Sequence, residues 1–225
     1  LKGKKLFLHF EAIMGKSRVF VNGKQLAEHF GGYLPVVVDI TNAVNWEGEN
    51  IIAVWSDNSD DKAYPPGKPQ RTLDYTYFGG IYRDCWLVAH NKVFIPDPNH
   101  ENIVAGGGLF VAYDKVSEAS ADVLLKAHIR NANRSAFKGT LHYELKDAEN
   151  KTVAQSKSRI AIKGGAAMHY SRKISVAQPQ LWSPDSPTLY SLYVRVLDQN
   201  GKVIDGYRRR IGIRSIEYFK SNVAQ

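Results

Sequence analysis

The sequence has very little cysteine and no long apolar run. Its 225 residues contain one cysteine, Cys85, which excludes a disulfide bond within the chain. The neighbours of this cysteine, Asp84 and Trp86, favour a buried structural thiol over an activated one. No apolar run approaches the roughly 20 residues that a membrane-spanning helix needs. The sequence therefore predicts no membrane span.

Acidic residues are in the minority, which raises the question of a nucleic-acid partner. The 30 Lys and Arg against 22 Asp and Glu give a formal charge of +8. However, the basic residues are spread along the chain, and no nucleic-acid-binding motif accompanies them. The densest run, Arg208-Arg209-Arg210, would be split between two faces of a strand. We therefore predict a solvated basic surface and no nucleic-acid partner.

The sequence also lacks the common motifs of metal and nucleophile chemistry. Its seven histidines are far apart and have no companion cysteines, so a zinc site is not predicted. Gly106-Gly107-Gly108 lacks the Lys-Ser/Thr pair of a phosphate loop, and there is no Gly-x-Ser-x-Gly elbow. The chain begins at Leu1 without an initiator Met or a signal peptide, so we expect a fragment of a longer protein. The compartment stays open, with a soluble periplasmic or secreted location favoured over a cytoplasmic one.

What the sequence does contain is a succession of short strand patterns, with no amphipathic helix. Residues 5–11 alternate, and Asn22-Gly23 is a strong hairpin signal. Three prolines mark residues 56–72 as a long loop, and a strand is predicted at 81–90. After a proline-rich boundary, seven more strands are predicted, at 108–114, 120–131, 139–147, 152–162, 166–176, 189–198 and 202–213. We predict an all-β chain with one sandwich to residue 94 and an immunoglobulin-like sandwich from 95 to 217.

The stretch at 73–87 is the main functional candidate. It combines five aromatic residues, the pair Gly79-Gly80 and three charges, directly after the long loop. The glycines permit a positive φ or a close approach of another chain. Irregular segments held by a rigid sheet often carry binding groups, which makes Asp74 the first suspect. The alternative is an Asx turn, in which Asp74 would bond to nearby backbone N–H groups. Aromatic residues nearby, such as Tyr75, could stack on a sugar but are more often core or interface residues.

Four motifs in order carry a resemblance to a known family. They are Val19-Phe20-Val21-Asn22-Gly23, Asp74-x-x-x-x-x-Gly80-Ile81-x-Arg83, Leu181-Trp182-Ser183-Pro184 and Gly212-Ile213-Arg214-Ser215-Ile216-Glu217. Together they resemble glycoside hydrolase family 2, which holds the β-galactosidases, β-glucuronidases and β-mannosidases. The likeness covers nearly the whole chain, and the order of the motifs makes it specific.

The resemblance implies a division of the chain into three parts. Residues 1–94 would be a jelly-roll, galactose-binding-like sugar-binding domain truncated at its N-terminus, and residues 95–217 an immunoglobulin-like domain. Residues 218–225 would begin the linker to a TIM-barrel catalytic domain. Family 2 enzymes carry both catalytic glutamates on that barrel, so the resemblance implies that these 225 residues are inactive by themselves.

The resemblance also implies roles for particular residues. Asp74, with Tyr75, would contact the sugar, and Asp74 would help to hold a sodium ion once the catalytic domain is present. The whole enzyme would use sodium or magnesium, and this part would need no cofactor. Structural roles at the junction with the barrel are implied for Gly79, Gly80, Arg83 and Arg214.

The activity implied is that of a β-galactosidase acting on terminal β-D-galactosyl residues, chosen from the sequence around Asp74. The partners would be a β-galactoside and the protein's own barrel. Whether the whole enzyme forms a homo-oligomer stays open. Two alternatives stay open: a β-glucuronidase or β-mannosidase of the same family, or a stand-alone carbohydrate-binding or adhesion module.

Overall fold

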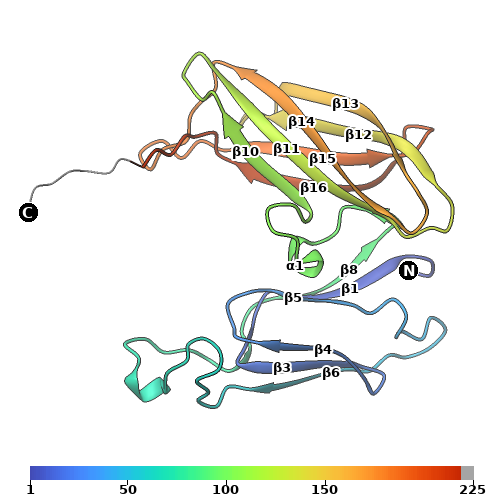
Figure 1. Cartoon of the computed structure of the whole chain (residues 1–225), viewed down its shortest axis with the longest axis vertical. Coiled ribbons are helices and arrows are strands. Elements are labelled where there is room, and N and C mark those ends of the chain that lie inside the picture. Colours follow the sequence, from blue (N-terminus) through green and yellow to red (C-terminus); the bar gives the residue numbers. More distant parts are fainter. Residues whose placement is uncertain (219–225) are drawn as a thin grey trace, which may run out of the picture. The chain divides into compact units, whose positions relative to one another are not determined.

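The computed structural model describes residues 1–218, whose regular secondary structure is almost entirely strand (Figure 1). The chain divides into two units. Unit 1 contains Leu1–Lys92 and Pro96–Gly107, and unit 2 contains Val93–Ile95 and the chain from Gly108 onward. Each unit has its own apolar core. The predicted all-β class with two sandwiches is confirmed. The chain enters unit 2 at Val93, before the predicted boundary at 94/95, and returns to unit 1 at Pro96, after it. Residues 219–225 of the predicted linker lie outside the described residues.

Unit 1 is built from two three-stranded antiparallel sheets, with strand orders β5-β1-β8 and β4-β3-β6, and a short ladder of β2 with β7. Alternation in β1 turns Leu6, Leu8 and Phe10 into the core, as the sequence predicts. The strands are β1 Lys5–Phe10, β2 Ile13–Met14, β3 Lys16–Val21, β4 Lys24–Phe30, β5 Val36–Asp39, β6 Ile52–Asp57, β7 Gly80–Ile81 and β8 Cys85–His90.

The hairpin between β3 and β4 forms at the predicted turn. Asn22 has φ 51° and Gly23 has φ 78°. Both positions of a type I′ turn need positive φ, which asparagine and glycine adopt at low cost. This turn joins β3 and β4, whose residues pair from Lys16 with Phe30 to Val21 with Lys24.

The single strand predicted at 81–90 is wrong, because β7 and β8 are separate. Gly80 and Ile81 pair with β2, whereas the chain from Cys85 pairs with β1. Between the two ladders, two residues on one side face three on the other (11–12 and 82–84), so regular pairing cannot continue. The backbone N–H of Glu11 donates to the carbonyl of Asp84 at 2.9 Å across this break.

The buried thiol predicted at Cys85 is also wrong, because Cys85 is exposed. Cys85 and Leu87 pair with Phe10 and Leu8, which lie in the core. Within the described residues, however, β8 is an edge strand of its sheet, and Leu87 is 54% exposed. Local alternation identifies the face of a strand but not whether that strand lies at an edge. Partial burial raises the pKa of the Cys85 thiol, so the thiol is not activated.

Unit 2 is a sandwich of two sheets. One has the order β10-β11-β14, with β9 beside β11, and the other has the order β13-β12-β15-β16. All seven strands predicted for this half are confirmed, two of them with identical ends. The strands are β9 Val93–Phe94, β10 Leu109–Asp114, β11 Ser120–Asn131, β12 Phe137–Lys146, β13 Thr152–Ile162, β14 Ala167–Ala177, β15 Tyr190–Leu197 and β16 Val203–Ile211.

Helix is confined, within the described residues, to two single turns. The 3-10 turn η1 spans Gln70–Thr72 in the long loop, and α1 spans Pro98–Glu101. The side chain of Asp97 caps α1 by accepting a hydrogen bond from the N–H of Asn99 at 2.8 Å. Pro98 occupies the first turn, where its missing N–H costs nothing.

Asn131 is a buried polar residue at the end of β11 that holds two loops of unit 2 together. Asn131 is 1% exposed. Its amide nitrogen donates to the carbonyl of Ser135 at 2.9 Å and to that of Ile162 at 3.1 Å. Its amide oxygen accepts from the N–H of Asn133 at 3.0 Å. The amide therefore provides partners for main-chain groups of both loops that are shielded from solvent.

We therefore expect Asn131→Asp to destabilise the chain by more than about 2 kcal/mol, because a carboxylate cannot donate to the buried carbonyls and carries a charge into the core. The measurement is the midpoint of urea unfolding. Asn200→Asp, in an exposed turn, is the control and should leave the midpoint nearly unchanged. Equal midpoints for the two variants would contradict this account of Asn131.

Candidate functional site

The segment that carries Asp74 is irregular but firmly anchored; we call residues 73–84 the Asp74 segment. Its β7 residues pair with β2, and Tyr77 is buried within it. The hydroxyl of Tyr82 donates to the carbonyl of Gly32. These anchors hold a segment without regular pairing against the rest of unit 1, which is how loops come to present binding groups.

The two adjacent glycines meet two different steric demands. Gly80 has φ +76°, in the region that costs other residues about 1–2 kcal/mol. Gly79 has no such φ, but a Cβ on it would lie 2.5 Å from Cγ of Asn58. Gly80 thus adopts the positive φ that the sequence analysis allowed, whereas the neighbour of Gly79 is a side chain of the same chain and not another chain.

Asp74 lies on the exposed surface of the Asp74 segment. In the described part of the chain its carboxylate makes no hydrogen bond or ion pair. The alternative of an Asx turn required bonds from this carboxylate to backbone N–H groups, so the geometry does not support it. Next to Asp74, Tyr75 is 49% exposed, and Phe78 is 73% exposed. A carboxylate with its acceptor sites open and aromatic surface nearby can accept hydrogen bonds from sugar hydroxyls.

Tyr33 belongs to the same surface, and the sequence analysis missed it. It comes from the loop between β4 and β5, and its hydroxyl interacts with that of Tyr75. This interaction, more than burial, raises the pKa of Tyr33 to about 12. The signal that could have pointed to it is Gly31-Gly32, a second glycine pair directly before the tyrosine. Nothing local in the sequence reveals that the two loops meet.

The two arginines assigned to the domain junction both lie against aromatic rings. The guanidinium carbon of Arg83 is 5.5 Å from the ring centroid of Tyr82, and that of Arg214 is 4.7 Å from the ring of Trp182. The N–H of Trp182 donates to the carbonyl of Ile213 at 2.8 Å, so two of the sequence motifs meet in unit 2. The stacking is favourable for arginine. Their role at a junction with a barrel stays a prediction.

No group of three or more His, Cys, Asp or Glu side chains within residues 1–218 could hold a metal ion. Asp74 is a single carboxylate, and hard cations need several oxygen ligands. The sodium ion at Asp74 therefore stays a prediction that needs further oxygen ligands. None of the helical turns in residues 1–218 is long and apolar enough to span a bilayer.

Two family models match the chain, and both describe the same family. Residues 1–91 match the sugar binding domain of glycosyl hydrolases family 2, and residues 107–214 match a second model of glycosyl hydrolases family 2. The chain belongs to glycosyl hydrolase family 2. The family resemblance of the four sequence motifs is thereby confirmed.

Relatives in this family carry two different activities in their names. A β-galactosidase of Thermoanaerobacter pseudethanolicus is 31% identical over 96% of this chain and 27% of its own length. A β-glucuronidase of Formosa agariphila is 30% identical over 98% of this chain and 23% of its own length. The solved structure of Bacteroides uniformis β-glucuronidase 2, covalently bound to cyclophellitol-6-carboxylate aziridine, matches 95% of this chain and 25% of its own, with 27% identity and a TM-score of 0.86. The chain thus spans about a quarter of the length of these relatives.

The separate demands at the two glycines predict different rescue behaviour. Gly79→Ala should lower the melting temperature because its Cβ meets the Asn58 side chain, and adding Asn58→Ala should restore most of the loss. Gly80→Ala should cost about 1–2 kcal/mol through its φ, and Asn58→Ala should not restore it. Thermal unfolding of the four variants measures both effects. Rescue of both glycine variants, or of neither, would contradict the assignment.

The contact between Tyr33 and Tyr75 predicts a titration effect. Tyr75→Phe removes the hydroxyl that acts on Tyr33, so the pKa of Tyr33 should fall from about 12 toward its ordinary value of about 10. Because the folded pKa is the higher one, the interaction contributes to stability below pH ~10 and this contribution is lost as the pH rises through about 12. Ultraviolet absorbance of tyrosinate measures the shift. Tyr207→Phe, which also removes one tyrosine, is the control, and a tyrosine pKa that stays at about 12 in Tyr75→Phe would refute the interaction.

Proposed function

We propose that the whole protein is a family 2 glycosidase that hydrolyses terminal β-D-galactosyl residues, and that this chain forms one wall of its substrate pocket. The glycosidase class rests on family membership and on relatives that are β-galactosidases and β-glucuronidases. The choice of a galactoside among the substrates of the family rests on Asp74.

The observation that carries the proposal is the open carboxylate of Asp74 on an anchored segment. Within the described residues its oxygens accept no hydrogen bond, yet the segment beneath it is fixed by Tyr77 and Tyr82. A fixed carboxylate with free acceptor sites loses little entropy when it binds hydroxyl groups. We assign Asp74 to the sugar hydroxyls and Tyr75 to the edge of the same subsite.

The charge of Asp74 supports a neutral sugar over an acidic one. A glucuronide carries its own carboxylate, and two carboxylates at close range repel each other unless one is protonated or a cation lies between them. A galactoside has only neutral hydroxyl groups to offer. This electrostatic difference favours the galactoside, and the same argument makes the glucuronide the outcome that would overturn the choice.

Catalysis itself needs a pair of carboxyl groups about 5–5.5 Å apart in a retaining enzyme. We place that pair in a part of the protein outside these 225 residues, and we expect the isolated chain to be inactive. A sodium ion at Asp74 would need further oxygen ligands from the same missing part. A homo-oligomeric state and a periplasmic or secreted location also stay predictions.

The test uses the full-length product of the gene. We expect it to hydrolyse nitrophenyl β-galactoside faster than the glucuronide or the mannoside. Asp74→Asn should lower kcat/KM for the galactoside by about 10–150-fold, because a hydrogen bond to a charged group contributes about 1.5–3 kcal/mol.

Asp84→Asn is the matched control. Asp84 is also exposed and lies on the same segment, and its carboxylate makes no contact in the described residues. The kcat/KM of Asp84→Asn for the galactoside should stay within about twofold of that of the unmodified enzyme, as for most surface substitutions. A preference for the glucuronide would refute the galactoside assignment. A full-length product without any glycosidase activity that still binds galactose would favour a stand-alone carbohydrate-binding module.

A further inference from the structure

The outer face of one sheet in unit 2 collects basic side chains that are far apart in the sequence. The sheet has the order β13-β12-β15-β16, and the alternate residues Leu141, Tyr143 and Leu145 of β12 point into the core. The intervening positions therefore point outward, together with the residues that pair with them. The cations at these outward positions are Lys138, Lys146, Lys157, Arg159, Arg195, Arg208 and Arg210, which we call the basic sheet face.

Strand register places these cations in adjacent rows. In one row Lys157 and Arg195 flank His142, and in another Lys146 and Arg210 flank Ser191. Neighbouring strands lie about 5 Å apart, and outward positions repeat about every 7 Å along a strand. Cations that flank a residue in a row are therefore about 10 Å apart, two strand spacings, whereas Lys157 and Arg159 or Arg208 and Arg210, two apart on one strand, are about 7 Å apart, within the Debye length of about 8 Å at physiological salt.

Little negative charge offsets these cations. Glu144 is the one carboxylate at an outward position of the paired strands in the described residues, and it accepts from Arg195 at 2.8 Å. That bond, with a second from Thr152, lowers the pKa of Glu144 to about 2. Burial, opposed by a hydrogen bond with Gln155, and then the charges of Lys157 and Arg195 lower the pKa of His142.

Aromatic surface on this face is already covered. Lys146, Arg195 and Arg208 lie 5.9, 4.9 and 5.6 Å from the ring centroid of Tyr193. Single-stranded nucleic acids need free aromatic faces on which bases stack, and duplexes need an element that enters a groove. This flat face offers neither. It offers fixed cations and, between them, neutral hydrogen-bonding side chains such as Thr140, Ser191 and Gln155.

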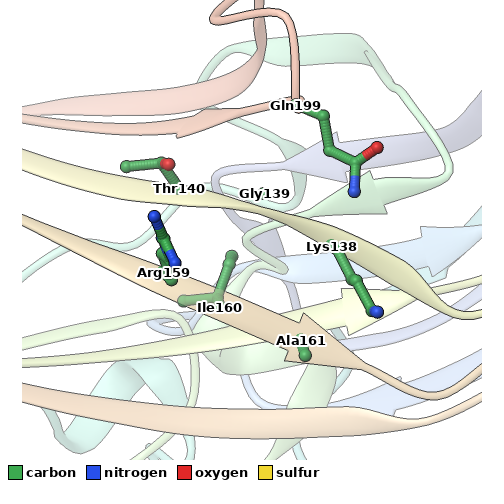
Figure 2. A pocket seen from close by; sticks show the side chains of 7 residues that line it. All are labelled: Lys138, Gly139, Thr140, Arg159, Ile160, Ala161 and Gln199. Carbon is green, nitrogen blue, oxygen red and sulfur yellow. The ribbon is translucent and has the colours of Figure 1, made fainter.

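A hollow adjoins the face at the Arg159 end. It has a volume of about 560 Å³, and Figure 2 shows Lys138 and Thr140 from β12, Arg159 from β13 and Gln199 from the turn after β15 around it. The volume falls within the range of small-ligand sites, about 300–1,000 Å³. Cationic and amide side chains at its rim suit a sugar that carries a carboxylate or a sulfate.

We propose that the basic sheet face binds an acidic polysaccharide, a glycan chain that carries a carboxylate or sulfate on many of its sugars. Charge complementarity carries the assignment, and the interleaved hydroxyl and amide groups supply partners for the uncharged hydroxyls of the chain. This binding belongs to residues 1–225 and does not depend on hydrolysis of any glycoside. It is compatible with the cleavage of neutral galactosyl ends on the same polymer.

The experiment measures binding of the 225-residue chain to polygalacturonate and dextran sulfate by isothermal titration calorimetry at several salt concentrations. Neutral galactan is the uncharged comparison, and a single-stranded oligonucleotide is the nucleic-acid comparison. We expect both acidic polymers to bind, with an affinity that falls steeply as salt rises, because bound cations release counterions. Galactan and the oligonucleotide should bind at least about tenfold more weakly than the acidic polymers.

The test variant is K157Q/R159Q/R208Q/R210Q, which removes four exposed cations and leaves the pairing of Glu144 with Arg195 intact. Its affinity for the acidic polymers should fall at least about tenfold, with a shallower salt dependence. The control, K115Q/K126Q/R134Q/K163Q, removes the same charge from other parts of unit 2 and should lose less than about threefold.

Circular dichroism checks that the variants fold, and the pairs K157Q/R159Q and R208Q/R210Q, tested separately, should each show part of the loss. Equal losses in test and control variants would attribute the binding to net charge and overturn the proposal. So would tighter binding of the oligonucleotide, equal binding of galactan, or no binding of either acidic polymer at low salt. If the full-length product does not bind the acidic polymers, the basic sheet face is covered in that protein, and this result would also overturn the proposal.

Discussion

The pairing of β7 with β2 determines where the Asp74 carboxylate can lie. Two residue pairs, Ile13 with Ile81 and Met14 with Gly80, tie an otherwise irregular segment to unit 1. Gly80 makes this pairing sterically accessible through its positive φ, and the burial of Tyr77 provides a further anchor. Without these constraints, Asp74 would be one more carboxylate on a loop. With them, it is a fixed acceptor.

The fold could be predicted largely from the sequence, because strands and turns have local signals. Alternation revealed β1 and seven of the eight strands described in unit 2, and Asn22-Gly23 revealed the hairpin. The errors came where pairing partners decide the outcome. The break between β7 and β8 depends on β1 and β2, and the exposure of Cys85 depends on the absence of a neighbour to β8 within the described residues. No property of residues 81–90 by themselves contains that information.

The candidate site was predictable only in part for the same reason. Asp74 and the glycine pair stand out within one short stretch, whereas Tyr33 and Asn58 reach it from other loops. The basic sheet face shows the effect most clearly. Arg208-Arg209-Arg210 does divide between two faces as expected, but strand register then adds Lys146 and Arg195 to the outward pair. A dispersed charge pattern in sequence becomes a concentrated one in space.

The exposed edge at β8 gives the net charge a second consequence. A strand that, within residues 1–218, is paired on one side only and carries apolar side chains such as Trp86 and Leu87 is a template on which another copy can add a strand, the first step of edge-to-edge aggregation. A charge of +8 on every copy opposes that encounter by mutual repulsion. The colloidal stability of the chain in solution therefore depends on ionic strength, since added salt screens the repulsion but does not change the apolar edge of β8.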